Sequence, residues 1–183
     1  MGIPKYPPPA KLFFGIIAQP EALEAALQAI EQNFGKIVAK SEVIPFSLTN
    51  YYADEMGENL LRQWVGVAGL FAQSQLADIK LRSNAIERAT SRNGKRTMNL
   101  DPGFVLASKL ILATTKDYSH RIYIGKGIFA EVTLIYKRKT GFQPLGWTYP
   151  DYKTDVALKF FNQLRAAYMQ ELRQMEGLLA AEL

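Results

Sequence analysis

The residue types most able to do chemistry are concentrated in residues 96–131, where polar side chains interrupt apolar runs. His120 is the only histidine of the chain, and histidine is the side chain that exchanges a proton near neutral pH. It stands beside Arg121, and arginine binds phosphate or carboxylate groups through paired hydrogen bonds. The stretch therefore predicts a polar cleft that binds a small anion and contains groups able to transfer protons.

The candidate site residues divide by the role that each side chain can perform. His120, Glu131 and Asp101 can accept and donate protons, so they are the catalytic candidates. The ligand-binding candidates offer charges, hydroxyls, an amide and a ring: Arg121, Lys116, Asp117, Thr115, Asn99 and Tyr123. Asp101, Asp117 and Glu131 would also be the ligands of any Mg²⁺, because this ion prefers oxygen ligands.

A predicted hairpin positions the arginine and the glutamate of this set. Gly125-Lys126-Gly127 separates two strand-like runs and indicates a three-residue turn. The register then pairs, from the turn outward, Ile124 with Ile128, Tyr123 with Phe129, Ile122 with Ala130, and Arg121 with Glu131. The isoleucines should occupy the face that packs on the core. The ion pair on the other face is either a structural contact or part of a ligand site.

Two turn-like corners flank the hairpin. A proline follows Asp101 and holds it in extended geometry, and the Pro102-Gly103 pair favours a tight turn. Thr114–Asp117 (TTKD) resembles the base-recognition motif [NT]-K-x-D of GTPases, but no residue separates the lysine from the aspartate. The chain also has no G-x-x-x-x-G-K-[ST] phosphate loop. These absences argue against a Ras-like GTPase and leave open a nucleotide or phosphate bound in another way.

The apolar pattern predicts the elements that position these residues. Lys11–Ala18 indicates a buried strand, and Pro20 opens a helix that Gly35 ends. With the next strand, this order predicts a ferredoxin-like β-α-β opening. A long helix capped by Thr154 carries an apolar stripe that would cover a sheet. The other predicted strands are 36–46, 60–71, 109–116, the two arms of the hairpin and 142–149.

The length of 183 residues suits one domain. We expect an α+β domain over residues 11–183, with a mostly antiparallel sheet and the long C-terminal helix packed on it. The proline-rich residues 1–10 predict a flexible tail. Residues 178–183 would extend the last helix into a contact between two copies of the chain, so a homodimer is one expected partner.

Three other segments each allow a functional and a structural interpretation. Residues 75–91 predict a helix in their second half, and the pattern around Lys80 fits either a strand or a helix. Trp147, Tyr149 and Tyr152 would either stack on a base or sugar or simply pack in the core. The polar loop 47–59 would either line the site or stay solvated; its candidate lining residues are Thr49, Tyr51, Tyr52, Asp54, Glu55 and Glu58.

Composition excludes several kinds of site. The chain has no cysteine, which removes disulfides, thiolate nucleophiles and cysteine-bound metals, and a single histidine removes zinc sites built on several histidines. The absence of cysteine fits a cytoplasmic location. The apolar run 12–18 is too short to span a membrane, so no membrane partner is expected.

The motifs of residues 99–152, taken together, resemble a known family. They are Asn99–Gly103, Ala113–Asp117, His120–Tyr123, Glu131–Leu134 and Tyr149–Tyr152, with Tyr51-Tyr52 and Glu55–Gly57 earlier in the chain. The combination is similar to the bacterial and archaeal family called domain of unknown function 4416, over nearly the whole chain. Some relatives carry a GTP-binding label, and the resemblance implies no catalytic residue.

Three functions remain open from the sequence. The first is an enzyme or binding domain for a small phosphorylated or nucleotide-like anion. The second is an RNA-binding module, which the 22 basic against 17 acidic residues and the basic runs 88–96 and 137–139 favour. The third is a non-catalytic domain whose polar centre is structural.

Overall fold

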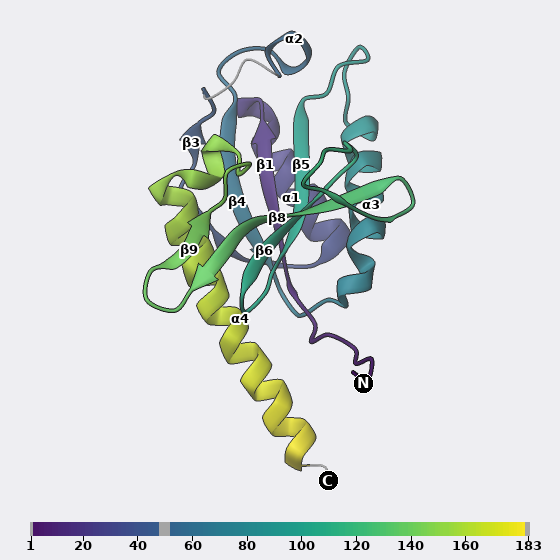
Figure 1. Ribbon diagram of the computed structural model, residues 1–183. Helices are drawn as coiled ribbons and strands as arrows, with labels where there is room; N and C mark the ends of the chain where they lie inside the picture. The colour runs from purple at the N-terminus through teal and green to yellow at the C-terminus, as the bar shows by residue number, and fades with distance from the viewer. Residues whose placement is uncertain (1, 48–51, 182–183) are drawn as a thin grey trace.

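The computed structural model describes residues 2–47 and 52–181 (Figure 1). Thr49 and Tyr51, two of the predicted lining residues, lie outside the described residues. The side chains of residues 178–181 are not described either, and neither are residues 182–183. The contact between two copies predicted for this end therefore stays a prediction.

The described residues form one nine-stranded sheet in which every neighbouring pair is antiparallel. The strands are β1 Lys11–Ala18, β2 Ile37–Lys40, β3 Ile44–Pro45, β4 Leu61–Val67, β5 Met98–Val105, β6 Lys109–Thr114, β7 Ile122–Gly125, β8 Ile128–Lys137 and β9 Gly141–Pro144. Their order is β2-β4-β1-β5-β6-β8-β7, with β3 beside β4 and β9 beside β8.

The helices are α1 Leu23–Phe34, α2 Ala53–Met56, α3 Leu76–Ala89 and α4 Asp155–Ala181. The order β1-α1-β2-β4-α3-β5 gives the β-α-β-β-α-β arrangement of a ferredoxin-like unit, and strands β6 to β9 extend its sheet. The prediction of a single α+β domain with a mostly antiparallel sheet is confirmed.

Strand β1 is an interior strand of the sheet, and its two faces belong to two different cores. Phe14 and Ile16 face α1 and α3, in a cluster with apolar residues of those helices. Phe13 faces α4, where its ring meets Phe161 edge to face at 4.9 Å. Each fully buried side chain of this kind contributes about 1.5–3 kcal/mol to stability. Figure 1 shows the resulting layers, with α4 on the face opposite α1 and α3.

Helix α4 begins and packs as its sequence predicts. The N–H of Ala157 donates to Thr154 Oγ1 at 3.3 Å, which caps the helix. The predicted stripe is buried at Phe160, Leu164, Tyr168 and Leu172. The hydroxyl of Tyr168 donates to the carbonyl of Pro9 at 2.9 Å, so the proline-rich segment meets the domain at its end. No helix among the described residues is both long and apolar enough to cross a membrane.

The expected turn at Pro102-Gly103 is wrong, because β5 runs straight through these residues. Its whole length pairs with β1, including Phe14 with Pro102. On its other side, pairing with β6 covers only Gly103–Val105. A proline is tolerated in a strand where no neighbour needs its missing N–H. Pro102 therefore stands where the pairing with β6 stops.

The hairpin around Lys126 is confirmed, and part of its predicted packing is wrong. Ile122 pairs with Ala130 and Tyr123 with Phe129, but a bulge places Gly125, rather than Ile124, opposite Ile128. Ile122 is 73% exposed, so the isoleucine face of β7 is not core. The physical reason is position: β7 is an edge strand, beyond the strands β5, β6 and β8 on which α3 packs.

Candidate functional site

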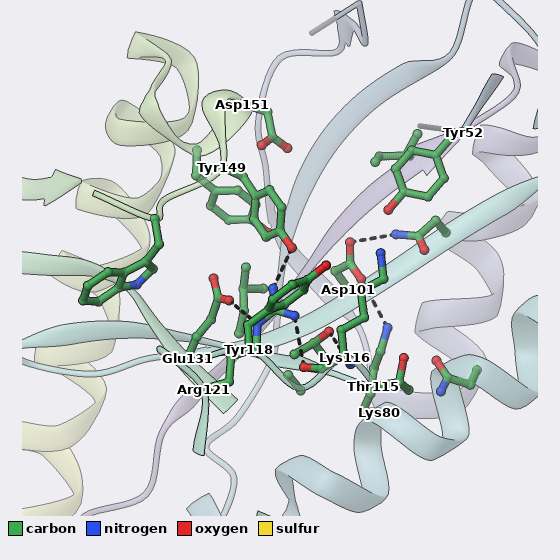
Figure 2. Close-up of a pocket in the computed structure, with 18 of the residues that line it drawn as sticks. Tyr52, Lys80, Asp101, Thr115, Lys116, Tyr118, Arg121, Glu131, Tyr149 and Asp151 are labelled. Carbon is green, nitrogen blue, oxygen red and sulfur yellow. Dashed lines mark hydrogen bonds and ion pairs between the residues drawn. The ribbon is translucent and has the colours of Figure 1, made fainter. Parts of the chain in front are cut away.

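A cleft opens where β5 and β6 separate. From Pro102 back to Met98, β5 pairs with β1 alone. Strand β6 continues to Thr114, paired with β8. The two strands stop bonding at Pro102, which has no backbone N–H. The sheet therefore splits there without leaving an unpaired backbone donor at this residue. A cavity of about 780 Å³ lies at this split (Figure 2), within the range of small-molecule sites.

One wall of the cavity is built around Arg121, which ends the loop after β6. Its Nε donates to Glu131 Oε2 at 2.8 Å, its Nη1 to the carbonyl of Lys116 at 3.0 Å, and its Nη2 to the hydroxyl of Tyr149 at 2.7 Å (Figure 2). The side chains of Arg121 and Glu131 are 2% and 1% exposed. The guanidinium also lies 4.7 Å from the ring centre of Tyr118. The predicted ion pair is therefore present, buried, and part of the cavity wall.

His120 is held against the same glutamate. Its Nε2 lies 3.2 Å from Glu131 Oε2. Its ring is stacked against those of Tyr118, with ring centres 6.1 Å apart and planes 5° apart, and Trp147, with ring centres 5.3 Å apart and planes 17° apart. Glu131 Oε1 also accepts from the hydroxyl of Thr133. A buried carboxylate that orients a histidine fixes which ring nitrogen it presents to a ligand, and His120 lines the cavity.

The floor of the cavity combines β5 with a lysine from α3. Asn99 Nδ2 donates to Asp101 Oδ2 at 2.7 Å. Lys80 Nζ donates to Asp101 Oδ1 at 3.2 Å and to the carbonyl of Leu100 at 3.0 Å. Lys80 comes from the helix on the opposite face of the sheet and reaches the cavity through the split. The gap between β5 and β6 therefore admits the buried cation of Lys80.

Arg96, just before β5, closes one end of the cavity. Its Nε and Nη2 donate to the two carboxylate oxygens of Glu55, at 2.6 and 2.7 Å. Its Nη1 donates to Glu87 Oε2 at 2.8 Å and to Asn99 Oδ1 at 2.9 Å. Glu87 Oε1 in turn accepts the N–H of Leu100 at 2.8 Å. This network fixes Asn99 and, through it, Asp101.

The two carboxylates on Arg96 should give opposite pH dependences of stability. The hydrogen bond from Arg96 lowers the pKa of Glu55 below its ordinary value of 4.5, whereas burial raises the pKa of Glu87 above that value. A lowered pKa stabilises the fold above pH 4.5, and this stabilisation is lost as the pH falls through the lowered pKa. A raised pKa means that the folded state binds the proton more tightly, so stability falls as the pH rises through it.

We therefore expect the free energies of unfolding of the Glu55→Gln and Glu87→Gln variants to diverge from the wild type in opposite directions. As the pH rises through 4.5, the wild type should gain stability relative to Glu55→Gln and lose it relative to Glu87→Gln. Urea denaturation between about pH 3 and about pH 7 measures both differences. Differences that change with pH in the same direction would contradict these assignments.

Arg62, on β4, is the least exposed cation of the cavity lining, at 1%. Its Nη2 pairs with Asp151 Oδ2 at 2.8 Å, while its Nε and Nη1 have no hydrogen-bond partner among the described residues. Its guanidinium carbon lies 4.8 Å from the ring centre of Trp64 and 5.1 Å from that of Tyr152. Burying a guanidinium with unused donors is costly, so the two unpaired nitrogens of Arg62 need a physical explanation.

Gly15, the neighbour on β1, makes room for that arginine. A Cβ at this position would lie 2.6 Å from the Tyr152 hydroxyl and 2.9 Å from Arg62 Nη2. Strand pairing sets Gly15 between Trp64 and Asp101. A side chain here would thus fill the space that the guanidinium occupies.

The structure brings most of the predicted site residues together. Those that line the cavity are Asn99, Asp101, Thr115, Lys116, His120, Arg121 and Glu131. Asp117 and Tyr123 do not line it: Asp117 is exposed in the loop after β6, and Tyr123 is 60% exposed, with its ring against Phe129. Of the polar loop 47–59, Tyr52 lines the cavity, while Glu55 acts through Arg96.

The expected Mg²⁺ ligands do not converge. Among residues 2–47 and 52–181, no group of three or more His, Asp or Glu side chains is placed to hold a metal ion. Asp101 pairs with Lys80 and Glu131 with Arg121, so each already has a cationic partner. The geometry of the described part therefore gives no support to Mg²⁺ bound by Asp101, Asp117 and Glu131.

Several lining residues were not singled out from the sequence as site residues, namely Arg62, Lys80, Glu87, Arg96 and Asp151. A signal for one of them was present. Arg62 lies in the apolar run LLRQWVGV, where an isolated arginine is unusual for a buried strand. Asp151 gives no such signal, because its partner lies 89 positions earlier in the chain and only the tertiary structure joins them.

Comparison with known proteins agrees with the motif resemblance of residues 99–152. A family model described as Domain of unknown function (DUF4416) matches residues 8–168. No curated protein and no solved structure matches the chain. The matched segment runs from the end of the proline-rich segment into α4 and includes every cavity residue named above. The chain therefore belongs to the family described as Domain of unknown function (DUF4416).

Proposed function

We propose that the protein binds a small phosphorylated, nucleotide-like anion in the cleft between β5 and β6. The observation that carries the proposal is the convergence of cations and aromatic rings on one cavity. The cations come from different parts of the fold and are Arg62, Lys80, Arg96, Lys116 and Arg121. The rings are those of Tyr52, Tyr118, His120, Trp147, Tyr149 and Tyr152.

Each half of this lining suits one half of such a ligand. Guanidinium groups bind phosphate oxygens through charge-assisted hydrogen bonds, which are the strong ones. Arg121 uses one N–H of each terminal nitrogen on Lys116 and Tyr149, and each of these nitrogens carries a second hydrogen. Flat rings at the mouth, among them the half-exposed Trp147 and Tyr149, offer surfaces on which a base or sugar can stack.

His120 adds a group for proton transfer at the same cavity. Its Nε2 is engaged by Glu131, and its Nδ1 has no hydrogen-bond partner among the described residues. An oriented imidazole of this kind is suited to take a proton from a bound ligand or to give one to it. The site thus has the means for catalysis as well as for binding.

The basic run 88–96 supports the RNA-binding alternative less than its sequence suggests. Arg96 is engaged by Glu55 and Glu87, and Lys95 Nζ donates to the carbonyl of Asp54 at 3.1 Å. These contacts direct part of the run toward the domain itself. A gel shift at low salt, where phosphate contacts are strongest, tests this alternative directly.

Replacing Arg121 with glutamine should weaken binding of adenosine 5′-monophosphate by about 10- to 150-fold, the effect of losing a charged hydrogen bond. Binding of uncharged adenosine should change little, because Arg121 would contact the phosphate. Calorimetric titration of both compounds against wild type and variant measures the difference. Circular dichroism checks that each variant is folded, and Arg121→Lys serves as a milder second variant.

Arg165→Gln is the matched control for this experiment. Arg165 also donates to a backbone carbonyl, that of Ala107 at 2.8 Å, and also lies over a tyrosine ring, that of Tyr136 at 3.4 Å. It lies on α4 and does not line the cavity. An equal loss of affinity in both variants, or no binding of the nucleotide to the wild type, would refute the proposed function.

A further inference from the structure

Arg62 has more hydrogen-bonding capacity than the protein uses. We infer that its guanidinium is a deep anion subsite of the cleft, which receives the phosphate or carboxylate group of the ligand, and that Asp151 occupies it when no ligand is present. This inference rests on the proposed function, and it names the residue that anchors the anion and the residue that competes with it.

The described neighbours of Arg62 offer no acceptor to its Nε and Nη1. Trp64 and Tyr152 present ring faces to the guanidinium, and Gly15 presents no side chain at all. Within the described part of the chain, the one side-chain acceptor bound to Arg62 is Asp151, through Nη2 alone. Since Arg62 also lines the cavity, a ligand in the cavity would supply the missing acceptor for Nε and Nη1.

The pairing with Asp151 is weaker than the geometry of the two groups allows. A carboxylate and a guanidinium can form two parallel hydrogen bonds, yet Asp151 uses one oxygen on one nitrogen. A purely structural ion pair at this burial would gain from the second bond, because each unsatisfied buried donor carries a desolvation penalty. The unused donors therefore indicate that Asp151 is a partial substitute for another anion.

The position of Asp151 in the chain explains how a ligand would replace it. Asp151 lies in the short 3-10 turn Pro150–Lys153, and Tyr149, directly before that turn, accepts the hydrogen bond from Arg121. Figure 2 shows Tyr149 directed toward Arg121, with Asp151 on the other side of it. One short segment thus contacts both Arg62 and Arg121. A ligand whose anion takes Arg62 would move this segment and loosen both contacts.

Charge determines the sign of the effect of replacing Asp151. An anion on Arg62 would meet the like charge of Asp151, whereas the nearby Asp101 is paired with Lys80. Removing the charge of Asp151 should therefore strengthen anion binding. If Asp151 instead built the site by orienting Arg62, removing it would weaken binding. The direction of the change distinguishes the two roles.

The test is a titration with inorganic phosphate and with adenosine 5′-monophosphate, followed by calorimetry. Arg62→Met should weaken both by about 10- to 150-fold, and Asp151→Asn should strengthen both by about fivefold or more, through loss of a like charge near the anion. Asn keeps an oxygen that can accept from Arg62, so this variant retains a partner for the buried guanidinium. Arg62→Lys, which keeps the charge and loses the planar fork, should weaken both less than Arg62→Met and covers the case in which Arg62→Met does not fold.

Lys11→Met is the control for the loss of a buried cation. Lys11 is buried, pairs with Glu171 Oε1 at 2.6 Å, and does not line this cavity. It should lower stability without changing either affinity. Arg62 variants that bind as the wild type does, or an Asp151→Asn variant that binds more weakly, would overturn the inference. Loss of binding in Arg121→Gln alone would leave the proposed function standing, and absence of binding to the wild type would remove both.

Discussion

Replacing Asp151 with alanine is expected to lower the free energy of unfolding by about 3–5 kcal/mol, the usual cost of removing one partner of a buried ion pair. The side chains of Arg62 and Asp151 are 1% and 8% exposed, so solvent cannot take the place of the lost carboxylate. The rings of Trp64 and Tyr152 attract the cation but accept no strong hydrogen bond. The guanidinium would be left buried with its charge uncompensated.

The double variant Arg62→Met with Asp151→Ala should recover most of that loss, because an apolar side chain of similar length removes the uncompensated charge. Urea denaturation of the wild type, both single variants and the double variant gives the coupling energy of the pair. Glu171→Ala is the control: it breaks the pair with buried Lys11, but Glu171 is 33% exposed, so a smaller loss is expected. A loss of under about 1 kcal/mol in Asp151→Ala would show that the pair behaves like a surface contact.

The parts of the fold that local patterns encode were predictable from the sequence. Strand Lys11–Ala18 was predicted to the residue, because its continuous apolar run is typical of a strand buried on both faces. The hairpin followed from a glycine-rich turn. Its predicted pairs of Ile122 with Ala130 and Tyr123 with Phe129 and its contact of Arg121 with Glu131 are correct, whereas the pair of Ile124 with Ile128 is not. In each case the deciding information lies within about a dozen residues of chain.

The rest of the site depends on strand order, which local patterns do not encode. Arg62 shares the cavity with Asn99 only because β1 lies between β4 and β5, with Ile17 paired to both residues. Lys80 reaches the cavity only because β5 and β6 separate. The expected turn at Pro102-Gly103 failed for the same reason. A proline and a glycine favour a turn locally, but here both residues continue the strand: Pro102 lies where β5 pairs with β1 alone, and Gly103 lies where β5 pairs with both β1 and β6.

Replacing Gly103 of strand β5 with alanine should lower the free energy of unfolding by about 3 kcal/mol or more, the upper end of overpacking effects. Gly103 pairs with Phe13 on β1 and with Leu112 on β6. A Cβ here would overlap the carbonyl oxygen of Ile111 and would lie 2.5 Å from Cζ of Phe13. A backbone carbonyl in a sheet cannot rotate away as a flexible side chain can, so the strands themselves have to move.

The movement should be localised at the junction that defines the cleft. Gly103 is the last β5 residue paired with β6 before the split, so pushing the strands apart there extends the split into the core. Urea denaturation gives the loss of stability, and hydrogen exchange of the amides of β5 and β6 should show faster opening than that of β1 and β4. Gly146→Ala is the matched control, since a Cβ at Gly146 has no atom within 4 Å, and its effect should stay within about 0.5 kcal/mol. If Gly103→Ala were equally mild, β5 and β6 would have to lie farther apart than the structure places them, and the origin assigned to the cleft would be wrong.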